Sequence, residues 1–94
     1  MRQIDRKYAT DGQIINTIKN TVVPEDEPLV LFRAKDNLLV PLVEHYLKLC
    51  TEAGSSQDHL DLLKLRIDDI KTWQRANPDR VGTPGTGWAE QKST

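Results

Sequence analysis

A short stretch near the N-terminus combines two cations with an aromatic ring and small polar side chains. Arg6, Lys7 and Tyr8 are consecutive, and residues 10–13 read Thr-Asp-Gly-Gln. An aromatic ring can stack on a nucleobase while a nearby cation contacts a phosphate, so these residues could line a pocket for a phosphorylated nucleotide. The other interpretation is a solvated segment whose tyrosine packs on the rest of the fold. The residues alone leave both interpretations open.

No other cluster in the sequence has a spacing suited to catalysis or metal binding. The glycines of GTPGTG, residues 82–87, are spaced as in a phosphate-binding loop, but Trp88 follows where that motif requires lysine. His45 and Cys50 are five residues apart and would not share one face of a helix, and His59 lies further along the chain. We therefore expect a protein that is not an enzyme and that uses no metal and no cofactor.

The composition predicts one small soluble domain without general affinity for nucleic acid. The chain has 94 residues, 37% of them hydrophobic and 29% charged, which is near the lower limit for a self-sufficient core. Its formal net charge of -1 argues against binding DNA or RNA, which normally requires a basic surface. The single cysteine cannot form a disulfide within the chain, and no apolar run is long enough to span a membrane. We expect a cytoplasmic protein that gains stability by oligomerisation.

The most apolar segment predicts a bent helix over residues 29–53. Pro28 suits the first position of a helix, and the three acids before it complement the helix dipole. Gly54 can adopt the left-handed conformation that ends a helix. Because Pro41 lacks an amide hydrogen, the helix must kink or restart between Asp36 and Pro41, and we expect a bend rather than a break.

A second helix is predicted to follow and to pack against the first as an antiparallel hairpin. Ser55 or Ser56 can cap its start, and it should end near Ala76, ahead of Pro78. Its apolar stripe comprises Leu60, Leu63, Ile67 and Ile70. The matching seam of the first helix comprises Leu38, Leu42, Tyr46, Leu49 and Ala53. Further aliphatic side chains of the first helix lie off this seam, so we expect other copies of the chain to cover them in a closed homo-oligomer.

The N-terminal segment is predicted to add a short element to this hairpin. Residues 10–13 fit a capping box that opens a short helix, although Asp11-Gly12 could also be the turn of a small hairpin. Residues 78–94 have too little apolar content to pack and should form a mobile tail. The sequence therefore predicts an all-α fold, with a helical-hairpin domain over residues 1–77, a proline-kinked first helix and a flexible C-terminal tail.

Two segments of the chain resemble a known family of small phage proteins. They are KYATDGQIINT, residues 7–17, and VPEDEPLVLFRAKDNLLVPLVEHY, residues 23–46, in which the PxDEP and LFRAKD patterns are the most specific parts. The family is that of the anti-CBASS sponges, which sequester the cyclic nucleotide signals of bacterial immunity. Its helical-hairpin domain also occurs in sponges directed against the Thoeris system. The resemblance extends over residues 4–76.

The resemblance implies a hexamer that binds cyclic dinucleotides such as cyclic GMP-AMP without cleaving them, in the cytoplasm of an infected bacterium. Some members also bind cyclic trinucleotides at separate sites. In the family a tyrosine near the N-terminus stacks on the base, and Tyr8 matches this role. A lysine or arginine contacts the phosphate, and the candidates in this sequence are Arg6, Lys7, Lys19 and Arg33.

Arg33 has an alternative role, and Arg66 is assigned to a separate site. Arg33 lies within the LFRAKD pattern and could instead hold the kink by pairing with Asp36. Arg66, on the second helix, is the candidate for a trinucleotide site, which would need cations from several chains on a symmetry axis. The alternative to the sponge function is a small oligomeric protein-interaction module, in which the exposed half of the hairpin docks on another protein.

Overall fold

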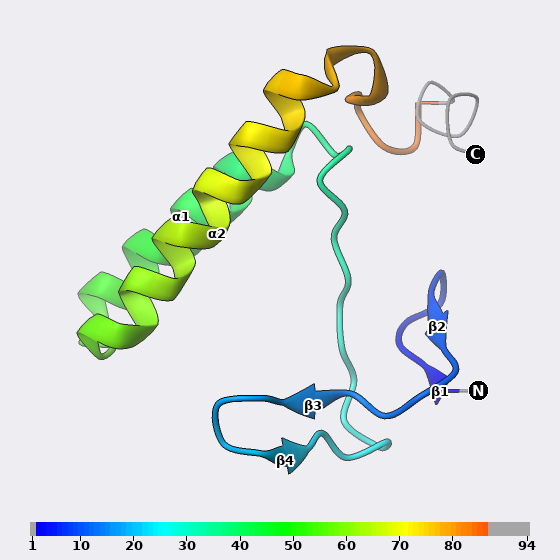
Figure 1. Cartoon of the computed structure of the whole chain (residues 1–94), viewed down its shortest axis with the longest axis vertical. Coiled ribbons are helices and arrows are strands. Elements are labelled where there is room, and N and C mark those ends of the chain that lie inside the picture. The colour runs from blue at the N-terminus through cyan, green and yellow to red at the C-terminus, as the bar shows by residue number, and fades with distance from the viewer. Residues whose placement is uncertain (1, 87–94) are drawn as a thin grey trace. The chain divides into compact units, whose positions relative to one another are not determined.

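The computed structural model describes residues 2–86 of the chain (Figure 1). The chain divides into two compact units, Met1–Leu31 and Phe32–Thr94. In the part that is described, the first unit contains short strands, and the second contains two helices followed by a single turn of 3-10 helix. Neither helix of this described part is long and apolar enough to cross a lipid bilayer.

The N-terminal unit is built from two small antiparallel hairpins. β1 (Arg2–Gln3) pairs with β2 (Ala9–Thr10), and β3 (Ile15–Asn16) pairs with β4 (Thr21–Val22). Seven of the ten residues 14–23 are β-branched, and such side chains favour extended backbone over helix. The prediction of an all-α fold is therefore wrong, because two two-stranded sheets accompany the helices.

The short helix predicted to start at residues 10–13 is not formed. Thr10 is the last residue of β2, and Asp11-Gly12 is a bend between the two hairpins rather than the turn of either one. The second hairpin turns through residues 17–20, where Asn20 has a φ of 54°. Asparagine tolerates this left-handed conformation better than most residues that carry a side chain. The predicted short helix is therefore wrong, and the alternative of a small hairpin is wrong in the position of its turn.

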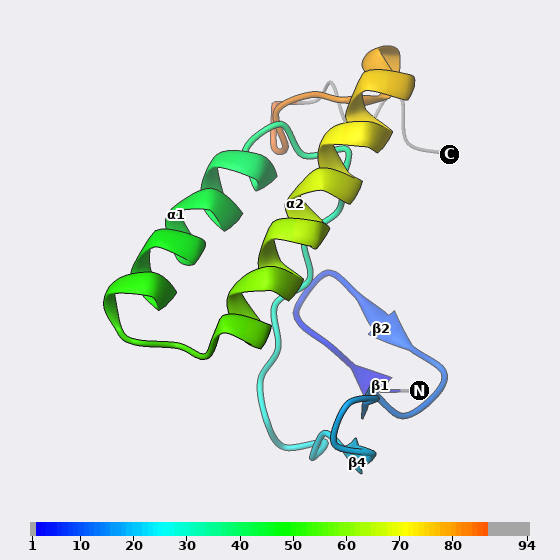
Figure 2. The ribbon, with the colours of Figure 1, turned by 60° about the vertical axis from the view of Figure 1, so that its left-hand side comes forward.

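The C-terminal unit is a hairpin of two helices that lie side by side (Figures 1 and 2). α1 spans Leu39–Glu52 and α2 spans Gln57–Ala76. Gly54 has a φ of 82° just after the first helix, as expected of the residue that ends it. At the start of the second helix, Ser56 Oγ accepts a hydrogen bond from the amide of His59. The predicted stop at Gly54 and the predicted cap at Ser56 are confirmed.

α1 begins later than the sequence predicts, and it begins without a kink. Residues 28–33 have no regular structure. The side-chain carboxylate of Asp36 accepts a hydrogen bond from the amide of Leu38 at 2.7 Å. The backbone carbonyl oxygen of Asp36 accepts one from the amide of Leu39 at 3.1 Å. Pro41 therefore lies in the first turn, where an amide hydrogen would have no partner within the helix. The predicted kinked helix is wrong because a short apolar run does not by itself distinguish helix from irregular chain.

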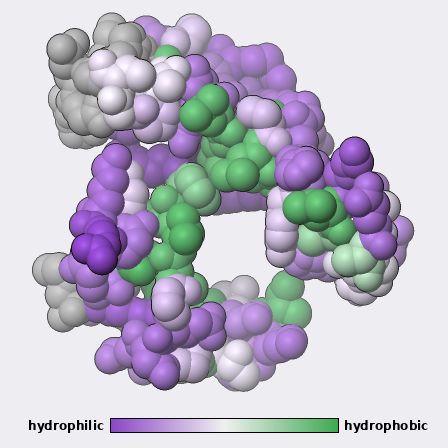
Figure 3. Space-filling view, turned by 180° about the vertical axis from the view of Figure 1, so that it is seen from behind, coloured by the Kyte–Doolittle hydropathy of each residue, from purple (hydrophilic) through white to green (hydrophobic). Residues whose placement is uncertain are grey.

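The core of the hairpin lies on a different face of α1 from the one that the sequence predicts. The buried apolar side chains are Leu39 and Cys50 of α1 and Leu60, Ile67 and Ile70 of α2. The predicted seam of α1 is exposed instead, with 55% of Leu38, 44% of Leu42, 50% of Tyr46 and 48% of Leu49 accessible. Both sets have helical spacing, so the periodicity identifies two apolar stripes without showing which one meets α2. Hydrophobic side chains remain visible on the surface of the hairpin (Figure 3).

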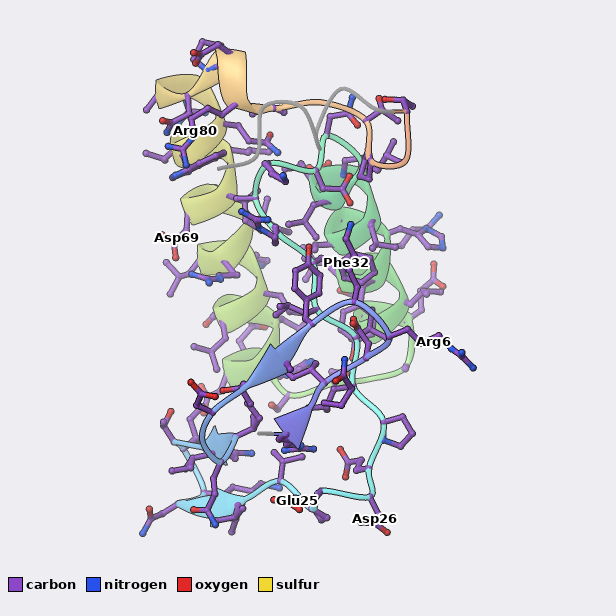
Figure 4. The ribbon with its side chains drawn as sticks, turned by 90° about the vertical axis from the view of Figure 1, so that its right-hand side faces the viewer. Arg6, Glu25, Asp26, Phe32, Asp69 and Arg80 are labelled. Carbon is purple, nitrogen blue, oxygen red and sulfur yellow. The ribbon has the colours of Figure 1, made fainter. Side chains whose placement is uncertain are left out.

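The acids that were expected to start the first helix lie in a turn that follows β4. The amide of Glu27 donates to the carbonyl oxygen of Pro24 at 3.2 Å, and Glu25 and Asp26 are exposed between them (Figure 4). Since no helix begins at Pro28, these carboxylates have no helix dipole to complement, and they are solvated.

The chain that leaves α2 returns to the segment that precedes α1. η1, a 3-10 helix over Pro78–Arg80, follows α2, and Gly82 then forms a parallel bridge with Asp36. Two backbone hydrogen bonds of 3.0 Å flank this bridge. Residues 78–86, which the sequence places in a mobile tail, therefore make defined contacts, whereas residues 87–94 of that tail lie outside the described residues.

Candidate functional site

Arg6, Lys7 and Tyr8 lie in the turn between β1 and β2, and hydrogen bonds fix the backbone of this turn. Asp5 Oδ1 accepts hydrogen bonds from the amides of Lys7, at 2.7 Å, and Tyr8, at 2.8 Å. The carbonyl oxygen of Tyr8 accepts hydrogen bonds from the amides of Ile4, at 2.8 Å, and Asp5, at 3.2 Å. The backbone of Tyr8 is therefore held at both its donor and its acceptor.

The turn brings one of its two cations to the aromatic ring. Lys7 Nζ lies 5.7 Å from the centroid of the Tyr8 ring, and the ring is half-buried. Arg6 is exposed and extends away from the turn (Figure 4). The turn thus presents a ring and an ammonium group together, which are the groups that a nucleobase and a phosphate would need.

The hydrogen bonds of the turn also affect the ionisation of Asp5. The amide of Lys7, followed by the amide of Tyr8, stabilises the carboxylate and lowers the pKa of Asp5 below its ordinary value of about 3.8. The carboxylate is therefore ionised at neutral pH, and it keeps both hydrogen bonds there.

Lys19 occupies a similar position in the other hairpin. Asn16 Oδ1 accepts hydrogen bonds from the amides of Ile18 and Lys19, each at 3.1 Å. Residues 14–23 include no aromatic residue, and Lys19 is exposed. This second turn therefore offers a cation without a stacking surface.

Arg33 and Arg66 belong to the helical unit, whereas Tyr8 belongs to the N-terminal unit. The ion pair between Arg33 and Asp36, given as the alternative role of Arg33, is not among those formed by residues 2–86, and Asp36 is used at the start of α1 instead. Arg66 forms an exposed ion pair with Asp69 one turn further along α2, at 3.5 Å. Neither arginine is therefore part of the turn that carries Tyr8.

Arg2 is a buried arginine that the sequence did not reveal. Its side chain donates hydrogen bonds to the carbonyl oxygens of Val23 at 3.3 Å, Pro24 at 2.8 Å and Glu27 at 3.4 Å, and the residue is 8% exposed. It ties β1 to the segment that follows β4. No pattern of residue types could have indicated this role, because all three partners are backbone carbonyl groups.

A second group of reactive side chains lies on the helical hairpin. Cys50 Sγ is 3.7 Å from Nε2 of His59, and the ring of His59 meets the ring of Tyr46 edge-on, with centroids 6.5 Å apart. A hydrogen bond with Cys50 raises the pKa of Tyr46. The described residues contain no group of three or more histidine, cysteine or acidic side chains that could hold a metal ion. The cluster joins α1, which carries Tyr46 and Cys50, to α2, which carries His59.

The chain matches no protein-family model, no curated protein and no solved structure. The candidate site is therefore defined by the chain's own residues, and it is the β1–β2 turn, residues 4–8. This turn presents Tyr8 and Lys7 together, while Arg6 points away from it and Lys19 lies on the other hairpin.

Proposed function

We propose that the protein is a phage immune-evasion sponge that binds cyclic dinucleotides, such as cyclic GMP-AMP, and does not cleave them. The observation that carries this proposal is the β1–β2 turn, where Lys7 Nζ lies 5.7 Å from the ring of Tyr8 on a backbone held by hydrogen bonds. The resemblance of residues 7–17 and 23–46 to the anti-CBASS sponges supports the same ligand. In this proposal the protein acts in the cytoplasm of an infected bacterium, where it withholds the messenger from an immune effector.

The symmetry of the ligand supports a site made by two chains. A cyclic dinucleotide has two bases and two phosphates in an approximately twofold arrangement, whereas one β1–β2 turn supplies one ring and one nearby ammonium group. Each base stack contributes roughly 1 to 3 kcal/mol, and each charge-assisted hydrogen bond roughly 1.5 to 3 kcal/mol. Two of each give about 5 to 12 kcal/mol, and nanomolar binding requires about 12 kcal/mol. The turns must therefore be ordered before the ligand arrives.

The exposed side chains Leu38, Leu42, Tyr46 and Leu49, here called the α1 stripe, are where we place the contact between copies. Each medium-sized aliphatic side chain left in water forfeits roughly 1.5 to 3 kcal/mol of burial. Covering the α1 stripe with the same surface of another chain recovers part of this free energy. A homo-oligomer, a hexamer by the resemblance, is accordingly part of the proposal.

The remaining cations are secondary candidates within the assembled protein. Arg6, Lys19 and Arg33 are exposed and could contact a phosphate from their own chain or from another copy. Arg66 is the candidate for a separate trinucleotide site, which requires it to exchange its contact with Asp69 for one with the ligand.

Isothermal titration of the purified protein with cyclic GMP-AMP, cyclic di-GMP and a cyclic trinucleotide tests the proposal. We expect saturable heat with at least one of the dinucleotides. Mass spectrometry of the ligand released by denaturation should recover it unchanged, because the proposal includes no cleavage. An intact oligomer that gives no heat with any of these ligands would refute it.

Tyr8→Ala should weaken the binding of the dinucleotide by about tenfold or more, because one lost base stack costs roughly 1 to 3 kcal/mol. Tyr8→Phe is the matched control, since it keeps the ring and should keep most of the affinity. Light scattering should show the same oligomer for both variants. If Tyr8→Ala instead dissociates the oligomer, Tyr8 contributes to assembly rather than to the ligand site.

The second candidate function, a protein-interaction module, is favoured by the exposure of the α1 stripe. In this case the α1 stripe would bind another protein rather than a second copy of the chain. Light scattering separates the two candidates, since an interaction module would be a monomer or dimer in dilute solution and would show no heat with cyclic nucleotides.

A further inference from the structure

One carboxylate holds the backbone that carries the candidate ring. Asp5 Oδ1 accepts the amides of both Lys7 and Tyr8, at 2.7 and 2.8 Å. Asp5 Oδ2 lies 3.5 Å from the amide nitrogen of Leu31, at the end of the same unit. Without this carboxylate, the amides of Lys7 and Tyr8 would lose these acceptors, and the turn would keep the hydrogen bonds that the carbonyl oxygens of Tyr8 and Asp5 accept.

The other hairpin shows which property of Asp5 the turn requires. In that hairpin Asn16 Oδ1, a neutral oxygen, accepts hydrogen bonds from the backbone amides of Ile18 and Lys19, each at 3.1 Å. An oxygen acceptor is therefore sufficient for this geometry, and a negative charge is not needed for it. The bonds to Asp5 are shorter, as expected for an ionised acceptor.

The charge of Asp5 opposes the binding of an anion. A carboxylate next to Lys7 offsets the positive charge that would attract a phosphate, so Asp5 would weaken binding if it acted through charge alone. Because both carboxylate oxygens of Asp5 already face backbone amides, this acid can favour binding through the conformation of the turn. The two effects have opposite signs, so substitutions can separate them.

We propose that Asp5 is a positioning residue, which orders the β1–β2 turn so that Tyr8 and Lys7 are presented to the ligand without contacting the ligand itself. This role rests on the proposed function. A turn that is ordered before binding avoids the entropic cost of ordering it in the complex. Asp5 thus contributes to affinity although its charge has the unfavourable sign.

Two substitutions of Asp5 in the full chain test this role by titration with cyclic GMP-AMP. Asp5→Ala removes both the acceptor and the charge, and we expect it to weaken binding by about tenfold. Asp5→Asn keeps the acceptor and removes the charge, so it should bind as tightly as the unmodified protein or more tightly. Ser56→Ala, which removes the cap of α2, controls for a general loss of stability and should leave the affinity unchanged.

Amide hydrogen exchange provides a readout of the turn itself. Exchange at Lys7 and Tyr8 should accelerate in Asp5→Ala and stay slow in Asp5→Asn. If Asp5→Ala binds as tightly as the unmodified protein, or if Asp5→Asn loses as much affinity as Asp5→Ala, the positioning role is wrong. If the unmodified protein binds no cyclic dinucleotide, the proposed function fails and this role fails with it.

Discussion

Replacing Gln74 with alanine should destabilise the helical hairpin more than its half-buried position suggests. Gln74 Nε2 donates to the carbonyl oxygens of Ala34, at 3.0 Å, and Asp36, at 3.3 Å. These bonds join the last turns of α2 to the segment that starts α1, 40 and 38 residues away in the chain. Gln74→Ala removes both bonds at once and leaves two carbonyl groups without this partner.

The expected loss can be worked out from these two bonds. A neutral hydrogen bond contributes about 0.5 to 1.5 kcal/mol net, so Gln74→Ala should cost about 1 to 3 kcal/mol of unfolding free energy. Gln57→Ala is the matched control on the same helix, because the side chain of Gln57 donates, among residues 2–86, only to the exposed carboxylate of Asp61, one turn away, at 2.8 Å. Such a pair contributes about 0.2 to 0.5 kcal/mol. Both substitutions replace glutamine with alanine near an end of α2, so most of the difference in helix propensity cancels.

Urea unfolding followed by far-ultraviolet circular dichroism measures this difference. With a slope of about 1 kcal/mol per molar for a small protein, the midpoint of Gln74→Ala should fall by roughly 1 M or more, and that of Gln57→Ala by less than about 0.5 M. All samples need the same protein concentration, because the stability of an oligomer depends on it. Equal midpoints for the two variants would show that the bonds of Gln74 do not stabilise the hairpin.

Two further predictions concern Gly54 and Asp5. Gly54→Ala should lower the free energy of unfolding by about 1 to 2 kcal/mol, because the φ of 82° at Gly54 is unfavourable for a residue with a Cβ. Gly54→Asn should lower it by less, since asparagine tolerates this conformation better. Equal melting temperatures for the two variants would contradict this prediction. Asp5 has a lowered pKa, so its contribution to the turn is complete above about pH 3.8 and is lost as the pH falls through the lower value of the folded state. The amide chemical shifts of Lys7 and Tyr8 should therefore titrate with a midpoint below pH 3.8, and a midpoint at or above that value would contradict the lowered pKa.

The elements that the sequence predicted well are those set by local chemistry. Gly54 and Ser56 act on the backbone within a few residues of themselves, so their roles follow from residue type alone. The apolar stripe of α2 was also predicted, since Leu60, Ile67 and Ile70 are buried and the other positions of that helix are mostly polar.

The start and the buried face of α1 depend on interactions that residue types do not show. Pro28 and Pro41 are both compatible with a first turn, and only the bonds made by Asp36 place the start at Leu39. The choice between the two apolar stripes of α1 is decided by the fit to α2. The second hairpin of the N-terminal unit, β3–β4, could have been expected from the β-branched residues 14–23, which outweigh the capping pattern just before them.

The candidate site was predicted in part. Tyr8 and Lys7 were selected because ring and cation are adjacent in the sequence, and the structure places them together. Asp5 and Arg2 were not selected, because their partners are amides and carbonyl groups of the backbone. Every residue supplies such groups, so no sequence pattern indicates which of them a side chain will use.

The burial of a charged residue, Arg2, rather than of apolar side chains has a thermodynamic consequence for the N-terminal unit. Within residues 2–31, Arg2 is the one buried residue, so this unit hides little hydrocarbon when it folds. The heat capacity change of unfolding comes mainly from apolar surface, and a calorimeter would therefore register the helical hairpin and scarcely register the two small sheets. The opening of these sheets would be nearly silent in a thermogram, and it would have to be followed amide by amide.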